Sequence, residues 1–328
     1  MIQSTNPMPN EPRKHHFIPK FYLAGFTKSG RTDGSLYVLD RRRHKRWQRT
    51  PEETAHERDF HAVDLGPGVN RMVIEKKLAD LEGRWSQVVR TVIATARIPQ
   101  DDTFDELMLF VAFMFVMVPQ VRDTLSMFTG NVLQSLIDAM LSTTEKRASF
   151  RRLVEEQENR KLTDDEFEAL VKFGVSRQYT VNFDQTWYVQ QMLWMGDRLA
   201  PLLKQRKWCL WQVEDDAPDL ICSDRPVAPT WLIPTPGPIG PSFRTPNTVV
   251  SIPLNRRVAL VSLIEAEIGW LELDRAGAAA VNSMTAMYAN QLYSSDEDFV
   301  WLMKDNRVGQ ASDLLAALGE EQQGDCSE

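Results

Sequence analysis

An uninterrupted apolar run from Leu107 to Val118 (LMLFVAFMFVMV) constrains the fold of this chain more than any other feature. Its twelve residues make a helix of roughly 18 Å, much shorter than the bilayer hydrocarbon core of about 30 Å. The run therefore predicts a helix buried in a protein core and not a membrane span. Thr103 and Glu106 stand in capping-box spacing before it, and Pro119 should end or kink the helix.

Apolar residues at helical spacing continue on both sides of this run and predict a helical region over residues 70–205. One stripe precedes the run at intervals of three and four residues, and its members are Ile74, Leu78, Leu81, Trp85, Val88 and Val92. A second capping box, Thr163 with Glu166, opens a later apolar stripe. The region is thus expected to hold several successive helices.

The pattern changes after residue 205, and residues 206–318 predict a strand-rich region closed by a helix. Residues 207–215 (KWCLWQVED) alternate like a strand, and residues 219–226 (DLICSDRP) are expected to be its hairpin partner. β-Branched segments further on predict more strands. The alanine-rich residues 274–293 predict the closing helix.

Residues 1–69 predict a basic, histidine-containing extended segment followed by a hairpin. Residues 36–40 (LYVLD) and 60–64 (FHAVD) both alternate like strands. The expected fold class is therefore α+β, with an N-terminal extended segment and hairpin, a central helical region, and C-terminal antiparallel strands with a closing helix. We expect a single domain over residues 1–328, ending in a disordered acidic tail at 319–328.

The number of cysteines and the N-terminal residues indicate the cellular compartment of the protein. Three cysteines in 328 residues cannot form a disulfide framework, and no CxxC pair suggests a zinc knuckle. The N-terminus lacks the apolar segment of a secretory signal. These features indicate a cytoplasmic protein without a membrane partner.

Positive charge is concentrated near the N-terminus, although the whole chain is acidic. The net charge is −7, yet residues 1–50 hold 11 Lys and Arg against 3 Asp and Glu. Much of the excess lies in residues 41–49, where Arg43, Lys45 and Arg46 precede Trp47. Such a cluster can neutralise phosphates and stack a base, so nucleic acid or a nucleotide is a candidate partner. The alternative is a solvated hairpin tip, and the two interpretations are compatible.

One segment resembles the opening of a bacterial protein family. Residues 14–26 (KHHFIPKFYLAGF) follow an HHxxPxxxLxxF pattern. Later pieces fit in the same order, and they are Glu75 with Glu82, the Gln120–Arg122 step, Cys222 to Pro226, Ile252 to Asn255, and Asn282 to Tyr293. Along nearly its whole length the chain resembles the family called domain of unknown function 4238. The resemblance implies an intracellular, usually bacterial protein and brings no established activity or cofactor.

All five histidines lie within the first 61 residues, so any imidazole ligand or base must come from this part of the chain. Adjacent residues of an extended segment point to opposite faces, so one of His15 and His16 can face a core and the other a site. Both are candidate catalytic residues, and His16 is also a candidate metal ligand. The alternative is a buried, hydrogen-bonded histidine that clasps the N-terminus.

Five further residues complete the candidate site. Glu75 and Glu82 are two helical turns apart on one face, about 10 Å along the axis, and are candidate metal ligands. Gln120 and Arg122 are candidate binding residues, because a guanidinium can hold an anion bidentately. Asp224 stands at the end of a predicted strand and is a candidate catalytic carboxylate, with a turn residue as the alternative.

These residues favour one function over two alternatives. The first is a metal-dependent phosphoester hydrolase that acts on nucleic acid or a nucleotide, using Mg²⁺, Mn²⁺ or Zn²⁺ as its divalent ion. The second is a non-catalytic binding or regulatory protein, in which the HHxxP segment is a structural clasp. The third is a small-molecule binding protein, for which a large apolar pocket among the Trp- and Met-rich helices would be the sign.

Overall fold

The computed structural model describes residues 13–233, 240–264, 270–303 and 305–314. The expected tail at 319–328 lies outside these residues. The helices are α1 (Lys20–Ala24), the 3₁₀ helix η1 (Pro51–Glu53), α2 (Val73–Thr95), α3 (Asp102–Val116), α4 (Pro119–Leu141), α5 (Thr144–Glu158), α6 (Asp164–Ser176), α7 (Gln185–Lys204) and α8 (Arg275–Ala286).

Strands form two larger sheets and two small ladders. The five-stranded sheet has the order β10 (Leu271–Leu273), β5 (Lys207–Val213), β9 (Val258–Leu263), β8 (Thr248–Pro253) and β7 (Ala228–Trp231). The four-stranded sheet has the order β3 (Lys45–Arg49), β2 (Leu36–Asp40), β11 (Gln291–Ser294) and β6 (Cys222–Ser223). The ladders pair β1 (Lys14–His16) with β4 (His56–Arg58) and β12 (Val300–Leu302) with β13 (Val308–Gln310).

The architecture confirms the expected α+β class. Along the chain, the β2–β3 hairpin comes first, α2 to α7 form the central part, and β5 to β13 follow with α8 among them. Every strand pair is antiparallel except β10 with β5.

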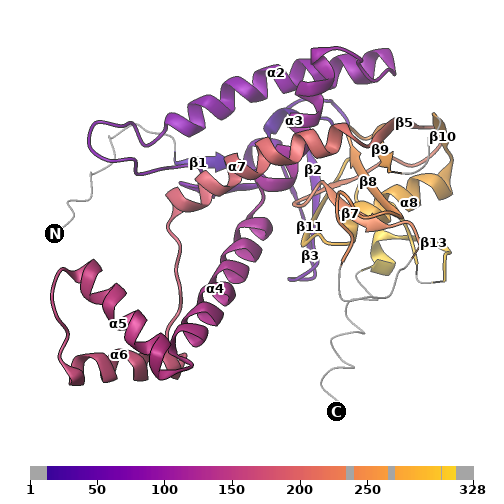
Figure 1. Cartoon of the computed structure of the whole chain (residues 1–328). Helices are drawn as coiled ribbons and strands as arrows, with labels where there is room; N and C mark the ends of the chain where they lie inside the picture. Colours follow the sequence, from indigo (N-terminus) through magenta and orange to yellow (C-terminus); the bar gives the residue numbers. More distant parts are fainter. Residues whose placement is uncertain (1–12, 234–239, 265–269, 304, 315–328) are drawn as a thin grey trace.

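The apolar run folds into α3 and the residues directly after it, as its composition predicts. Leu107, Phe110 and Val111 have no exposed surface, and α3 contacts both α2 and α7 (Figure 1). α3 starts slightly earlier than the capping box implies, because the Asp101 side chain accepts the Thr103 N–H at 3.0 Å. After the break at Pro119 the chain continues as α4, bent by 65° from α3. The second box, at Thr163, is confirmed as the cap of α6.

Two strand expectations are wrong. Residues 219–226 do not pair with β5, because β6 pairs with β11 of the other sheet while β5 lies between β9 and β10. Residues 60–64 form a turn and coil, and the strand is β4, four residues earlier. Asp59, with a φ of 57°, ends β4, and residues 60–63 are all buried, so their apparent alternation does not mark one exposed face.

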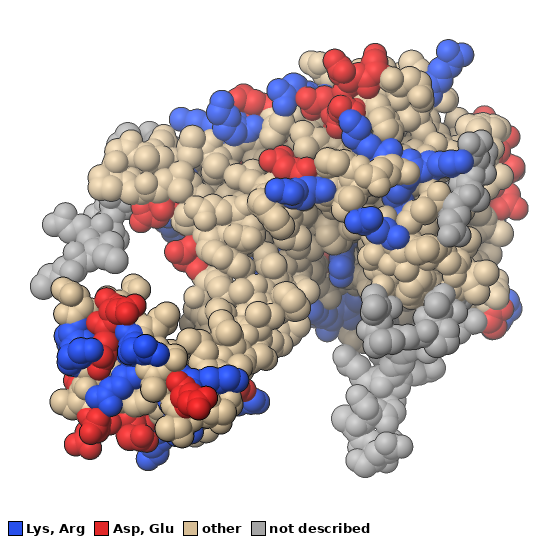
Figure 2. All heavy atoms as spheres, in the orientation of Figure 1, with Lys and Arg blue, Asp and Glu red and all other residues tan. Residues whose placement is uncertain are grey.

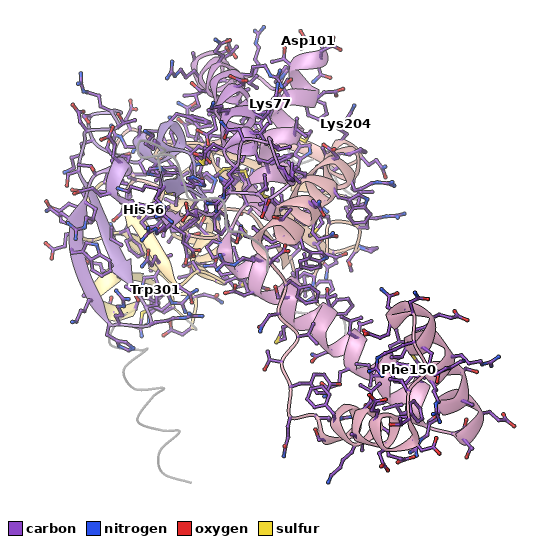
Figure 3. All side chains as sticks on the ribbon, turned by 90° about the vertical axis from the view of Figure 1, so that its left-hand side faces the viewer. His56, Lys77, Asp101, Phe150, Lys204 and Trp301 are labelled. Atoms are coloured by element: carbon purple, nitrogen blue, oxygen red, sulfur yellow. The ribbon has the colours of Figure 1, made fainter. Side chains whose placement is uncertain are left out.

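Helices α4, α5 and α6 project from the rest of the molecule as an arm (Figures 1 and 3). Phe150 of α5 lies near the arm's far end, well away from His56 and Trp301 (Figure 3). α4 buries only Val121 and Leu141, near its two ends.

Among the described helices, no single one combines the length and hydropathy needed to cross a bilayer, and α3 with α4 reaches them only as a bent pair.

Candidate functional site

A cavity of about 890 Å³ lies between the β2–β3 hairpin, β4, the start of α4 and the loops that flank β6 and β11. We call it the central pocket. Its lining is rich in charge of both signs; the charged side chains are Arg42, Arg43, Lys45, Arg49, Arg122, Asp40, Glu53, Glu57, Asp123 and Asp224. Figure 2 shows Lys and Arg side chains in the recess between the arm and the strand-rich body.

Asp224 is the most deeply buried of these carboxylates apart from Asp40, at 6% exposed. It follows β6, whose pairing with β11 brings it beside Asn290. Asp224 Oδ1 accepts the Asn290 N–H at 3.0 Å, and Oδ2 accepts an N–H of the Gln120 side chain at 2.5 Å. Burial raises the pKa of Asp224 to about 6, against the opposing effect of these hydrogen bonds. A carboxyl group with this pKa can both take up and release a proton near neutral pH.

Arg122 reaches the pocket from the first turn of α4. Its Nη1 donates to Glu57 Oε2 at 2.7 Å, and its Nε donates to Asp123 Oδ1 at 3.1 Å. Its Cζ lies 5.2 Å from the centre of the Phe60 ring, within cation–π range. These contacts fix the plane of the guanidinium, which remains one-quarter exposed.

The hairpin contributes its basic residues according to strand alternation. Lys45, Trp47 and Arg49 of β3 line the pocket, whereas Arg46, between them in sequence, does not. Arg46 lies 3.9 Å from Asp298 instead. Arg43 lies in the turn, where its backbone N–H is held by Asp40 Oδ1 at 2.9 Å and its side chain is 73% exposed.

Two of the histidines, His15 and His61, form a separate cluster with Glu75 outside the central pocket. His15 and His61 are 0% and 1% exposed, and their rings stack with centroids 5.8 Å apart. His61 Nδ1 is 2.8 Å from Glu75 Oε2, and His15 Nδ1 is 3.7 Å from the same oxygen. The His61 backbone N–H donates to His15 Nδ1 at 2.8 Å. One suitable atom from each of the three side chains lies within 4.8 Å of the other two.

His16 and Glu82 lie outside this three-residue cluster. His16 points away from His15, as expected for neighbours in a strand, and its Nε2–H donates to the Glu52 carbonyl at 3.2 Å. Burial lowers the pKa of His16 to about 4. Burial, assisted by the charge of Glu75, raises the pKa of Glu82 to about 7.

The candidate residues from the sequence thus fall into two groups. Gln120, Arg122, Asp224, Arg43 and Lys45 share the central pocket. His15 and Glu75 meet in the histidine cluster, while His16, Glu82 and Arg46 belong to neither group.

Sequence reasoning missed His61 and the pocket residues Asp40 and Asn290. His61 carried one usable signal, because it is a histidine in the histidine-rich N-terminal part and precedes the Glu75 helix. Asn290 lies in one of the segments that carry the family resemblance.

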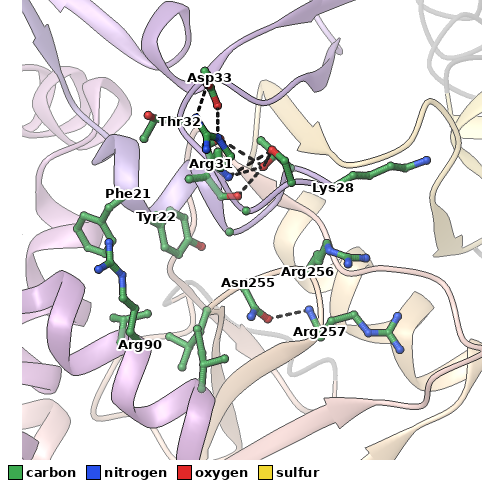
Figure 4. A pocket seen from close by; sticks show the side chains of 18 of the residues that line it. Phe21, Tyr22, Lys28, Arg31, Thr32, Asp33, Arg90, Asn255, Arg256 and Arg257 are labelled. Carbon is green, nitrogen blue, oxygen red and sulfur yellow. Dashed lines mark hydrogen bonds and ion pairs between the residues drawn. The ribbon is translucent and has the colours of Figure 1, made fainter.

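A second cavity of about 880 Å³ lies beyond η1, between α2, the loop after α1 and the β8–β9 turn (Figure 4). Its cations are largely matched by acids. Arg31 donates two hydrogen bonds to Asp33 at 2.9 Å, and Arg256 and Arg257 both bind Asp219. It holds no buried carboxyl comparable to Asp224 in its lining, so the central pocket is the stronger candidate.

An apolar cavity of about 340 Å³ lies near Phe115, Phe243 and Tyr288. It is much smaller than the two charged cavities.

Comparisons with known proteins give one match. The model of a family described as protein of unknown function (DUF4238) matches residues 14–295. Neither the curated proteins nor the solved structures gave a match.

Proposed function

Because the chain belongs to the DUF4238 family, whose match includes every residue that lines the central pocket, we propose its function from that pocket: it is a phosphoester hydrolase acting on a nucleotide or nucleic acid. A buried carboxyl group with a shifted pKa, facing a large polar cavity, is typical of a catalytic centre. Asp224 carries the proposal, since it combines these properties within a pocket that also holds Arg122.

Phosphate binding is assigned to the pocket cations. The Arg122 guanidinium has a fixed orientation and would bind two phosphate oxygens. The side chains of Arg43 and Lys45 are exposed and would contact a phosphate from the hairpin side. Trp47 on the same face of β3 offers a surface on which a base would stack.

The proposed reaction uses Asp224 as a general base. Its carboxylate accepts a proton from water as the water oxygen forms a bond to phosphorus. The ester P–O bond breaks, and the leaving oxygen takes a proton from solvent. The pocket cations stabilise the charge that builds on the phosphoryl oxygens.

The divalent ion expected from the sequence is not part of this step. His16, Glu75 and Glu82, its expected ligands, do not line the central pocket.

The test compares turnover and binding in the same variant. Wild-type protein should hydrolyse a nucleotide or bis(p-nitrophenyl) phosphate, and Asp224→Asn should lower kcat by about 10²- to 10⁴-fold while still binding the nucleotide. Asp138→Asn is the matched control, at a partly exposed position on the arm where Asp138 pairs with Arg177. No turnover by the wild type on any nucleotide or phosphodiester, or equal turnover by Asp224→Asn, would reject the hydrolase.

A non-catalytic binding protein is the second candidate, and the bonding of the pocket acids favours it. Glu57 is bound by Arg122, Asp40 by Gln291 and Arg43, and Asp224 by Gln120. Carboxylates so arranged also serve to shape a binding surface. Nucleotide binding without turnover in the wild type would favour this candidate.

A cytoplasmic location forms part of the proposal. Cys209 and Cys222 are buried and unpaired, and burial raises the pKa of both thiols, which keeps them unreactive.

A further inference from the structure

Three side chains from separate segments converge beneath β1. His15 comes from β1 itself, His61 from the coil after β4, and Glu75 from the first turn of α2. We propose that these three residues bind a transition-metal ion of the zinc type. Neither the family match nor the central pocket assigns a role to this site.

The donor atoms define the class of ion. Two imidazole nitrogens with one carboxylate oxygen suit Zn²⁺, Co²⁺ or Fe²⁺, whereas Mg²⁺ and Ca²⁺ prefer sites made of oxygen alone. With bonds of about 2.0–2.2 Å, the ligand atoms of such an ion lie about 3–4 Å from one another. The contacts of Glu75 Oε2 with the two Nδ1 atoms, at 2.8 and 3.7 Å, are close to this range.

The surroundings leave one route of approach. Both imidazoles are buried, and the Glu75 side chain is 30% exposed, so an ion would enter past the carboxylate. The ion would replace the hydrogen bond between His61 and Glu75 by a bond to each of them. If His15 binds the ion through Nδ1, the ion also replaces the hydrogen bond that this nitrogen accepts from the His61 backbone N–H. The β1–β4 ladder positions the His15 ring, and the coil after β4 positions the His61 ring. The two rings stack, so both imidazoles are already close to a common point.

The site lies apart from the proposed reaction. None of the three residues lines the central pocket, so the inference goes beyond the proposed function and does not rest on it. A bound ion would join β1 to α2 and fix the HHxxP segment against the helical core. It would therefore act first on the stability of the N-terminal part.

Metal binding by the full-length protein tests the site. Protein stripped with a chelator and dialysed is titrated with Zn²⁺ in a calorimeter, and Co²⁺ loading is followed by its visible absorption. The wild type should bind one equivalent of either ion, and Zn²⁺ should raise its Tm. Glu75→Gln and His61→Gln should weaken binding by more than about 100-fold, because even residues that only orient ligands contribute about 10- to 100-fold.

The chain provides close controls. His16→Gln changes the neighbouring histidine, and Glu82→Gln changes a second partly buried acid on α2; both variants should bind the ion as the wild type does. Should His61→Gln fail to fold, Glu75→Gln at its partly exposed position still decides the result. Absence of stoichiometric binding by the wild type, or equal losses in controls and cluster variants, would overturn the site. Nucleotide binding measured on the same samples keeps this result separate from the proposed function.

Discussion

Gln120 donates a side-chain hydrogen bond to Asp224 at 2.5 Å, while its own Oε1 is buried with no hydrogen-bond partner among the described residues. The amide is therefore oriented by a single bond to the carboxylate. Rotating it by 180° would place Oε1 where Nε2 now lies. Gln120 can thus form a hydrogen bond with either a carboxylate or an amide side chain at position 224.

This geometry predicts that Asp224→Asn folds normally. The new amide can still accept the Asn290 N–H, and it can donate to Gln120 Oε1 after that side chain rotates. The raised pKa of Asp224 means that its stabilising contribution is complete below about pH 4 and is lost as the pH rises through about 6. Asp224→Asn should consequently be more stable than the wild type at pH 8, by up to about 3 kcal/mol, and lose this advantage at pH 4.

Urea denaturation at the two pH values measures the effect. Lower stability of Asp224→Asn than of the wild type at pH 8 would show that the carboxylate is needed for the fold, and would remove the argument for a poised catalytic group.

Glu82 and Glu75, on the same helix, should respond to pH in opposite directions. The pKa of Glu82 is raised to about 7, so its stabilisation is lost as the pH rises through that value. Burial acts to raise the pKa of Glu75 as well, but the hydrogen bond and charge of His61 outweigh it and hold that pKa below the ordinary value. Glu75 therefore adds stability above its unfolded-state pKa and loses it in acid.

Amide variants of the two residues separate these effects. At pH 8.5 the free energy of unfolding of Glu82→Gln should exceed that of the wild type by about 1–3 kcal/mol, whereas that of Glu75→Gln should be lower than in the wild type. Thermal unfolding between pH 4 and 9 follows both. Parallel pH profiles for the two variants would contradict the described environments.

Two helical glycines should respond to alanine in opposite ways. A Cβ at Gly196 of α7 would lie 2.5 Å from the Phe113 ring of α3, so Gly196→Ala should cost about 1–3 kcal/mol through overpacking. At Gly130 of α4 the nearest atom is 4.0 Å away, and Gly130→Ala should stabilise by about 0.5–1 kcal/mol. Denaturation midpoints measure both, and a tolerated Gly196→Ala would contradict the close α3–α7 packing.

Local signals in the sequence predicted much of this fold. The apolar run specified a buried helix because nearly every side chain in it needs burial, and Thr163 with Glu166 specified the start of α6. Alternation specified β2 and the hairpin that presents Lys45. Each of these features depends on residues close together in the chain.

The features that sequence did not predict depend on distant residues. The partner of β6 is β11, about 70 residues later, and hydrophobic alternation does not specify which strand pairs with which. For the same reason His61 was not recognised as the second histidine of the cluster with His15, while Glu82, although regularly spaced from Glu75, lies outside it. Gln120 and Asp224 meet only because β6 and the start of α4 adjoin in three dimensions.

Calorimetric titration with a nucleoside monophosphate tests most directly whether the central pocket binds phosphate. The wild type should bind, and the double variant Arg43→Ala/Lys45→Ala should weaken binding by about 100-fold or more, because each charged hydrogen bond contributes about 1.5–3 kcal/mol. Arg46→Gln, in the same basic run but outside the pocket, should bind as the wild type does. No binding by the wild type, or equal loss in Arg46→Gln, would contradict the assignment of this pocket.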